Sequence, residues 1–217
     1  MKSLLSAIIP TTLLSIIHSS ASLNTAADMK TRSIESAATT STNAIITKGS
    51  PTCPGSPAFK NASCSMVITF PRSTTCSMVQ SEITSRMNGV NGWVDPHNSG
   101  TYSLLNNLVN IEEQMSQLTG SRTTADGKYT DIFLFVLEED STGESGCILS
   151  GCSESQVFSV LDFSTNYCNL RNLYCNNKDD GCQIVDHDFD YEETYLSCWQ
   201  NDGTRCIAGS DSNLNVA

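Results

Sequence analysis

Acid–base chemistry in this sequence would centre on His187, one of three histidines among 217 residues. It lies in QIVDHDFDYEE (183–193), where alternation predicts a strand with His187 on its apolar face. There it could act as a general base if a carboxylate from another strand oriented its ring. Asp162 interrupts the apolar run 157–163, and a buried carboxylate needs a partner, so we expect Asp162 in that role. The alternative is that His187 is a hydrogen-bonded core residue, as a lone histidine on an apolar face usually is.

Metal binding would centre on the other face of the same segment. Asp186, Asp188 and Asp190 alternate along it, and their oxygens could hold Ca²⁺. Alternate side chains of a strand are about 7 Å apart, however, which is too far for all of them to meet one ion. An EF-hand loop also needs glycine at its sixth position, where this sequence has Tyr191. A solvated outer face is therefore the favoured interpretation, and calcium binding is the alternative.

A third group of candidates lies in the turn-rich sequence DPHN (95–98). Binding and catalytic residues concentrate in loops, and Asp95 and His97 could form such a pair. The favoured alternative is that Asp95 and Asn98 only cap turns through their side chains.

Several reaction classes have no signature in the sequence. There is no G-x-S-x-G elbow, because the nearest pattern, GCSES (151–155), lacks the second glycine. There is also no P-loop, no G-x-G-x-x-G and no H-E-x-x-H motif. We therefore expect no cofactor, and the sequence does not support hydrolase or oxidoreductase chemistry.

The ten cysteines indicate an oxidising compartment, because their number is even and the chain begins like a secreted protein. None of them forms the C-x-x-C or C-x-x-H pair that a structural zinc site would need. We predict that all ten form disulfides, with the pairing left open: Cys53, Cys64, Cys76, Cys147, Cys152, Cys168, Cys175, Cys182, Cys198 and Cys206.

The domain organisation follows from composition. Residues 1–22 are typical of a signal peptide, with Lys2 before an apolar run and small residues after it. Residues 23–60 are rich in Ser, Thr and Ala and predict a disordered linker or propeptide. We expect the folded domain at 61–206 and a disordered tail at 207–217. No later stretch is apolar enough to cross a membrane, so we expect a secreted protein without a span in its mature chain.

The expected surface is acidic and carries one glycosylation sequon. Residues 1–128 have nine Lys/Arg and seven Asp/Glu, whereas residues 129–217 have three and sixteen, a net charge of −13. Such a surface repels phosphate backbones, so we expect no nucleic-acid partner. It suits cationic partners, divalent ions or solubility. Asn61-Ala62-Ser63 is the sequon, which places a predicted glycan on Asn61.

Apolar periodicity predicts one helix and an antiparallel sheet. A helical stripe contains residues spaced i, i+3, i+7 and i+11: Cys76, Val79, Ile83 and Met87. Strands are predicted at 65–71, 132–137, 157–163 and 183–193. Residues 123–137 are predicted to form a hairpin with Asp126-Gly127 in a type I′ turn, and residues 103–118 could be helix or strand. The predicted fold is α+β and β-dominant: one helix packed on an antiparallel meander in a single disulfide-stapled domain.

Three stretches also carry a resemblance: GWVDPHNSGTYSLL, DGKYTDIFLFVL and GCSESQVFSVLDFSTNYCNLRNLYC. They are similar to a group of secreted, cysteine-rich proteins of microalgae, and the resemblance covers residues 64–198. That group has no established activity, ligand or catalytic residue, so the resemblance implies no function for this chain.

These observations favour a secreted, non-enzymatic binding or cell-surface-associated protein with an unknown extracellular ligand. The first alternative is a small secreted enzyme that uses a His/carboxylate pair in a cavity between helix and sheet. The second is a carrier of a small apolar ligand in the same cavity. The shape and lining of any such cavity would distinguish these three functions.

Overall fold

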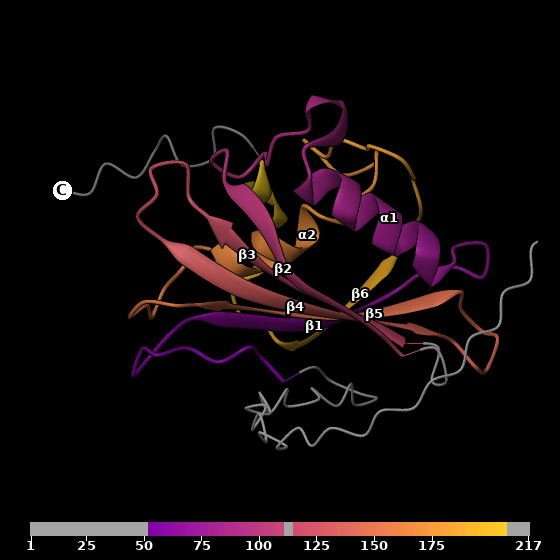
Figure 1. Cartoon of the computed structure of the whole chain (residues 1–217), viewed down its shortest axis with the longest axis horizontal. Coiled ribbons are helices and arrows are strands. Elements are labelled where there is room, and N and C mark those ends of the chain that lie inside the picture. The colour runs from indigo at the N-terminus through magenta and orange to yellow at the C-terminus, as the bar shows by residue number, and fades with distance from the viewer. Residues whose placement is uncertain (1–51, 111–114, 208–217) are drawn as a thin grey trace, which may run out of the picture. The chain divides into compact units, whose positions relative to one another are not determined.

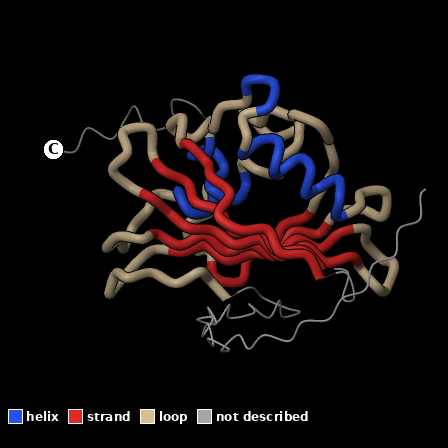
Figure 2. The backbone as a smooth tube through the Cα atoms, in the orientation of Figure 1, coloured by secondary structure: helices blue, strands red, loops and turns tan. Residues whose placement is uncertain are grey.

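The computed structural model describes residues 52–110 and 115–207, which form a six-stranded antiparallel sheet with two α-helices (Figure 1). The strand order across the sheet is β2-β3-β4-β5-β1-β6. In chain order the elements are β1 (Ser63–Thr69), α1 (Cys76–Met87), η1 (Val90–Gly92), β2 (Thr101–Asn110), β3 (Met115–Thr123), β4 (Thr130–Glu139), β5 (Cys147–Ser155), α2 (Thr165–Arg171), β6 (Glu192–Ser197) and η2 (Gly203–Cys206). Figure 2 shows both helices on the same side of the strand layer. The predicted α+β, β-dominant fold is confirmed.

The apolar run of β4 builds the centre of the sheet. This strand lies between β3 and β5, as expected for a strand that is apolar on both faces. The buried rings of Phe133 and Phe135 lie opposite Gly120 of β3 and Gly151 of β5. A Cβ atom on Gly120 would come within 2.3 Å of the Phe133 ring, so the aromatic core needs glycine on the neighbouring strands.

Helix α1 follows the predicted stripe. It begins after Thr75, whose Oγ1 accepts a hydrogen bond from the Met78 amide at 3.3 Å. It ends at Met87, shortly before Gly89, whose φ of 63° is in the left-handed region. The four stripe residues are buried against the sheet, so the helix prediction is confirmed.

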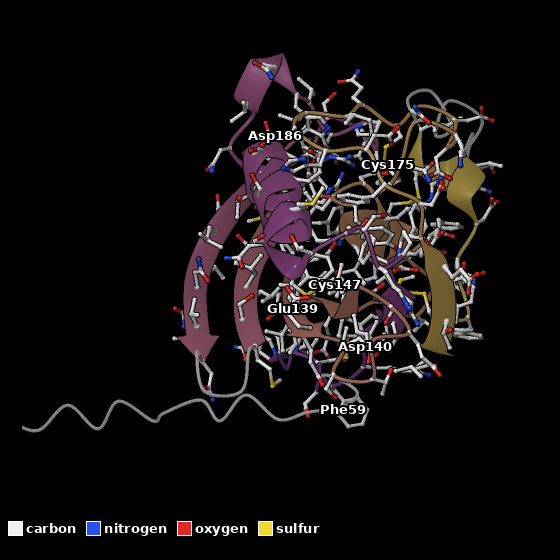
Figure 3. The ribbon with its side chains drawn as sticks, turned by 90° about the vertical axis from the view of Figure 1, so that its right-hand side faces the viewer. Phe59, Glu139, Asp140, Cys147, Cys175 and Asp186 are labelled. Atoms are coloured by element: carbon white, nitrogen blue, oxygen red, sulfur yellow. A yellow bond between two sulfur atoms is a disulfide. The ribbon has the colours of Figure 1, made fainter. Side chains whose placement is uncertain are left out.

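Five disulfides staple the domain: Cys53–Cys152, Cys64–Cys198, Cys76–Cys147, Cys168–Cys206 and Cys175–Cys182. The Cys76–Cys147 bridge joins the first residue of α1 to the first residue of β5. Beside it, Oε1 of Glu139 accepts a hydrogen bond from the Cys76 amide at 2.9 Å (Figure 3). The prediction of a disulfide-stapled domain is thereby confirmed.

The folded part begins before residue 61. Cys53 is bridged to β5, and the Gly55 amide donates to Oε2 of Glu154 at 2.7 Å. Residues 52–60 therefore attach to the sheet instead of belonging to the linker predicted at 23–60. The predicted signal peptide (1–22) and all but the first residue of the predicted tail lie outside the described residues.

The predicted strand at 157–163 is wrong, because these residues form a loop. The preceding strand, β5, already pairs with β4 on one side and β1 on the other, so neither edge can accept another strand. Phe163 and Ser164 have φ values of 53° and 71°, which an extended strand does not contain.

The strand predicted at 183–193 is also wrong, since 183–191 is irregular and β6 begins at Glu192. The physical reason is the buried carboxylate of Glu82. It accepts hydrogen bonds at 2.9, 2.6 and 2.7 Å from three successive amides, those of Val185, Asp186 and His187. Successive amides of a strand point in opposite directions and cannot all face one carboxylate.

Residues 103–110 and 115–118 belong to the β2–β3 pair, so the helical alternative for 103–118 is wrong. Asn106 and Asn107 are poor helix formers, and both pair with β3. The predicted hairpin is β3–β4, but its connection is longer than two residues. The Gly127 amide donates to the Thr124 carbonyl at 2.8 Å, and Gly127, unlike Asp126, has a positive φ, so the type I′ turn is wrong.

Candidate functional site

A pocket of about 540 Å³, called the loop pocket below, lies beside the loop 157–163. Its other walls come from Asp131 and Ser155, which lie near the start of β4 and at the end of β5, and from Thr165 at the start of α2. Small-molecule sites commonly have volumes of about 300–1,000 Å³. The loop pocket is therefore large enough for a small organic ligand.

The outer wall of the loop pocket is apolar. This wall is the loop 157–163, and five of its seven residues have exposed apolar side chains: Val157, Phe158, Val160, Leu161 and Phe163. Phe158 is 70% exposed and Leu161 is 56% exposed. One hydrogen bond holds the middle of this loop to the segment before β1, because the Ser159 amide donates to the Lys60 carbonyl at 3.1 Å. Single exposed apolar side chains are common on protein surfaces, whereas several adjacent ones often mark a binding surface.

Asp162 lies at the base of the apolar loop, just before α2. Its Oδ2 accepts hydrogen bonds from the amide and the Nδ2 of Asn166, at 2.9 and 2.7 Å. Its Oδ1 accepts no hydrogen bond from the residues that the structure describes. The carboxylate is thus oriented through one oxygen, while the other remains available to a ligand.

Asp131 forms the inner wall of the pocket and is 5% exposed. Its Oδ2 accepts a hydrogen bond from Nδ2 of Asn169 at 2.8 Å, and the Ser155 hydroxyl also bonds to the carboxylate. Burial raises the pKa of Asp131 above its ordinary value, with a further increase from the charge of Asp162. The hydrogen bonds and the charge of Arg122 oppose this increase.

Helix α2 holds the carboxylates beneath it through three buried or nearly buried asparagines at a spacing of three residues. Asn166 donates to Asp162, Asn169 to Asp131 and Asn172 to Asp95, at 2.7, 2.8 and 2.9 Å. Residues i and i+3 of a helix lie on one face, so the sequence NYCNLRN places Asn166 and Asn169 together on the buried side of α2, and Asn172 follows directly after the helix. Polar groups in this interior are therefore fixed by hydrogen bonds from one short helix.

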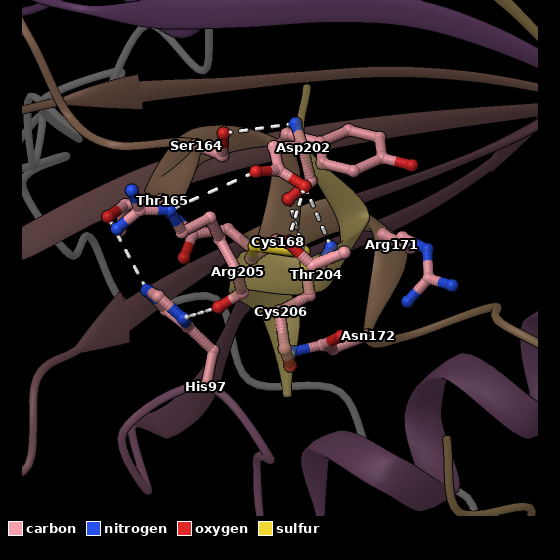
Figure 4. Close-up of a disulfide and its surroundings, with 12 residues drawn as sticks. His97, Ser164, Thr165, Cys168, Arg171, Asn172, Asp202, Thr204, Arg205 and Cys206 are labelled. Atoms are coloured by element: carbon pink, nitrogen blue, oxygen red, sulfur yellow. Dashed lines mark hydrogen bonds and ion pairs between the residues drawn. A yellow bond between two sulfur atoms is a disulfide. The ribbon is translucent and has the colours of Figure 1, made fainter. Parts of the chain in front are cut away.

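His97 is buried and lies beside Thr165 of α2 (Figure 4). Its Nδ1 lies 2.7 Å from the Arg205 carbonyl and therefore donates to it, and its Nε2 lies 3.4 Å from Oγ1 of Thr165. Thr165 lines the pocket, so His97 supports one of its walls. The carbonyl is next to Cys206, which is bridged to Cys168 of α2.

Asp95, the other candidate in this loop, has a structural environment. Its Oδ2 lies 2.6 Å from Nη2 of Arg122, and both side chains are fully buried. The carboxylate also accepts hydrogen bonds from the amides of His97 and Gly100, both at 3.2 Å. The turn-capping interpretation of Asp95 therefore agrees with the structure. Asp95 also forms a buried ion pair with Arg122, which the sequence did not indicate.

The structure does not bring His187 and Asp162 together. The His187 amide donates to Glu82 of α1, whereas Asp162 accepts from Asn166 of α2. Among the described residues, no hydrogen bond or ion pair joins the two side chains. The pairing was expected from two strands, and neither segment forms one. Catalysis by this pair is therefore without geometric support here and stays a prediction.

The three calcium candidates bond to different parts of the molecule. Asp186, beside α1 in Figure 3, accepts hydrogen bonds from Ser81 and Ser85. Asp188 accepts one from the Asn177 amide at 3.1 Å, and Asp190 pairs with Lys178. Across residues 52–110 and 115–207, no group of three or more His, Cys, Asp or Glu residues is arranged to hold a metal ion.

The sequon residue Asn61 lies two residues before the start of β1 and is partly buried. Its Nδ2, the atom that a glycan would modify, donates to Oε1 of Glu154 at 2.6 Å. Glycosylation of Asn61 stays a prediction.

Sequence reasoning missed Asp131 and the loop pocket itself. A signal for Asp131 was present, because period-two alternation places it on the same face of β4 as Phe133 and Phe135. The pocket could not be found this way, because it depends on 157–163 being a loop.

No protein-family model, curated protein or solved structure matches this chain. Among the described residues, no helix has the length and apolar character needed to cross a membrane.

Proposed function

We propose that this protein is a secreted, non-enzymatic binding protein whose loop pocket captures a small molecule with an apolar part. The observation that carries this proposal is the exposed apolar side chains of loop 157–163 around a pocket with a polar inner wall. Ligand sites combine these features, because an apolar lining provides affinity and a few fixed polar groups provide orientation.

Exposure of the loop has a free-energy cost that a ligand would remove. Burial of one large apolar side chain contributes about 1.5–3 kcal/mol. Phe158 and Leu161 remain more than half exposed in the folded chain, so a ligand lying against them would gain much of this contribution. This supports a ligand with an apolar part.

The pocket walls are fixed before any ligand enters. The Cys168–Cys206 bridge holds α2, and its asparagines hold Asp131 and Asp162. A preformed pocket loses less conformational entropy when it binds a ligand than a pocket that must first become ordered. The geometry is consistent with direct capture.

Secretion is supported by the predicted leader at 1–22 and by five disulfides, which persist in oxidising compartments. The enzyme alternative has less support, because the His187 amide bonds to Glu82 of α1 and Asp162 bonds to Asn166 of α2. No observation favours attachment to a cell surface over capture of a ligand.

The test is a fluorescence titration of the full chain with Nile red, a neutral apolar dye that brightens in apolar surroundings. Leu161→Gln should weaken dye binding by about tenfold, because it removes apolar contact worth about 1.4 kcal/mol or more. Leu105→Gln on β2 is the matched control, since Leu105 is also 56% exposed but does not line the pocket. Absence of dye binding by the wild-type chain, or equal effects of the two variants, would contradict the proposal.

A further inference from the structure

We infer that the ligand of the loop pocket carries a positively charged amino group that binds Asp162, with Asp131 contributing a second negative charge at the inner wall. This inference rests on the proposed function and adds the chemical class of the ligand. Its basis is the charge of these two carboxylates, the orientation of Asp162 and the burial of Asp131 beside an apolar wall.

The charged lining of the loop pocket has one sign. Its charged side chains are two carboxylates, and the rest of its polar lining consists of hydroxyl and amide side chains, without lysine, arginine or histidine. Arg122 lies opposite Asp131 in the β3–β4 register, but it is ion-paired with Asp95. These three residues and Asp162 together have one positive and three negative charges, which leaves an excess of two negative charges for a cation to balance.

Asp162 has the geometry of a recognition group. Its Oδ2 is held by Asn166, so the carboxylate does not need to become ordered when a ligand binds. Its Oδ1 receives no hydrogen bond within the described chain and can accept one from an ammonium N–H. Hydrogen bonds that involve charged groups are stronger than those between neutral groups.

Asp131 adds electrostatic attraction for a cationic ligand at the inner wall of the loop pocket. It is 5% exposed and takes its hydrogen bonds from Asn169 and Ser155, so we assign it a charge role and no direct ligand bond. Burial raises the pKa of Asp131, and a cation in the pocket would favour its ionised form. Amine binding and ionisation of Asp131 therefore support each other.

Ligands of other charge fit less well. A carboxylate or phosphate would enter beside two negative side chains, and like charges brought together in a partly buried site repel. A neutral alcohol could still bond to Asp162, but without the charge attraction. The expected order of affinity among ligands with the same apolar tail is amine, then alcohol, then carboxylate.

The test uses three probes with the same eight-carbon tail, octylamine, octanol and octanoate, in competition with Nile red on the full chain at neutral pH. Octylamine should bind at least about tenfold more tightly than octanol, since one charge-assisted bond is worth more than 1.4 kcal/mol. Octanoate should bind most weakly. Added salt should weaken octylamine and leave octanol unchanged, because salt screens only the charged interaction.

Asp162→Asn separates charge from shape. The asparagine oxygen can still accept from Asn166, so we expect octylamine affinity to fall about tenfold while octanol affinity stays the same. Asp186→Asn is the matched control, because Asp186 is an exposed carboxylate that bonds to α1 and does not line the pocket. If Asp162→Asn fails to fold, the wild-type probe order and its salt dependence still decide the question.

Failures of the two proposals differ. If octanol and octylamine displace the dye equally well, or octanoate binds best, the amine inference is wrong while capture of apolar ligands stands. If Asp162→Asn folds, binds Nile red and leaves octylamine affinity unchanged, the assigned role of Asp162 is wrong. If the dye and all three probes fail to bind, both proposals are wrong.

Discussion

Nδ2 of Asn169 lies 2.8 Å from Oδ2 of Asp131, and this hydrogen bond joins α2 to β4 in the interior of the domain. Asn169 is fully buried and Asp131 is nearly so. A buried carboxylate is tolerated only with hydrogen-bond partners, so the bond fixes where α2 lies on the sheet. It also sets the inner wall of the loop pocket.

Asn169→Leu should destabilise the fold by about 2–3 kcal/mol, because it removes the amide donor from a buried carboxylate. The measurement is chemical unfolding at neutral pH with intact disulfides. The double variant Asp131→Leu/Asn169→Leu should recover most of the loss, since replacing both partners by apolar groups leaves neither unsatisfied. A cost below about 0.5 kcal/mol for the single variant, or an additive loss in the double, would show that this bond does not anchor α2.

The stability of the fold should depend on pH through Asp131. Burial raises the pKa of Asp131 above the ordinary value of 3.8, so the folded state binds the proton more tightly than the unfolded state. This contribution is fully present below the unfolded pKa and is lost as pH rises through the folded pKa. Asp131→Asn resembles the protonated form, so its stability relative to wild type should increase as pH rises from about 4.

Unfolding of both proteins across this pH range tests the sign. Asp140→Asn is the control with the opposite sign, because hydrogen bonds from Ser145 and Thr142 hold the pKa of Asp140 well below its ordinary value. The wild-type protein gains stability from ionised Asp140 as pH rises, so the stability of Asp140→Asn relative to wild type should fall. If both variants change in the same direction, the assignment of Asp131 is incorrect.

The sequence predicted the parts of the fold that depend on local pattern. Alternation and apolar runs located β1 and β4, and the stripe from Cys76 to Met87 located α1. These predictions worked because each element buries the face that its own residues define.

The failures came from interactions between distant residues. Residues 183–193 do alternate, and Phe189 is buried as the alternation predicts. However, three successive amides of this segment donate to Glu82, about a hundred residues earlier, and are not free to pair with a neighbouring strand. Loop 157–163 has strand-like composition, yet it cannot pair with the preceding strand β5, which already lies between β4 and β1. The candidate site was therefore predicted only in part: Asp162 lines the pocket and His97 supports one of its walls, while Asp131 and the apolar wall were missed.

Glu82 and Arg86 of α1 form a buried charged pair whose loss should be costly. Both side chains are fully buried, with Nε of Arg86 2.6 Å from Oε1 of Glu82. Arg86 also donates to the carbonyls of Asn172 and Cys175, at 2.9 and 2.8 Å. Burial alone would raise the pKa of Glu82, but hydrogen bonds from three backbone amides and the charge of Arg86 lower it below its ordinary value. Glu82 is thus bound in its ionised form.

Glu82→Ala should cost about 3–5 kcal/mol, because it leaves the Arg86 charge buried without its anionic partner. It should also release segment 183–191, whose three amides lose their acceptor. Chemical unfolding measures the first effect and limited proteolysis within 183–191 the second. Glu192→Gln, a change at an exposed carboxylate of β6, is the control and should alter neither.

The double variant Glu82→Leu/Arg86→Met distinguishes the two roles of Glu82. Replacing a buried ion pair by apolar residues of similar size is often neutral, so global stability should return toward wild type. The amides of Val185, Asp186 and His187 would still lack an acceptor, so proteolysis within 183–191 should remain fast. Recovery of protease resistance together with stability would mean that the ion pair alone, and not the capture of backbone amides, holds this segment against α1.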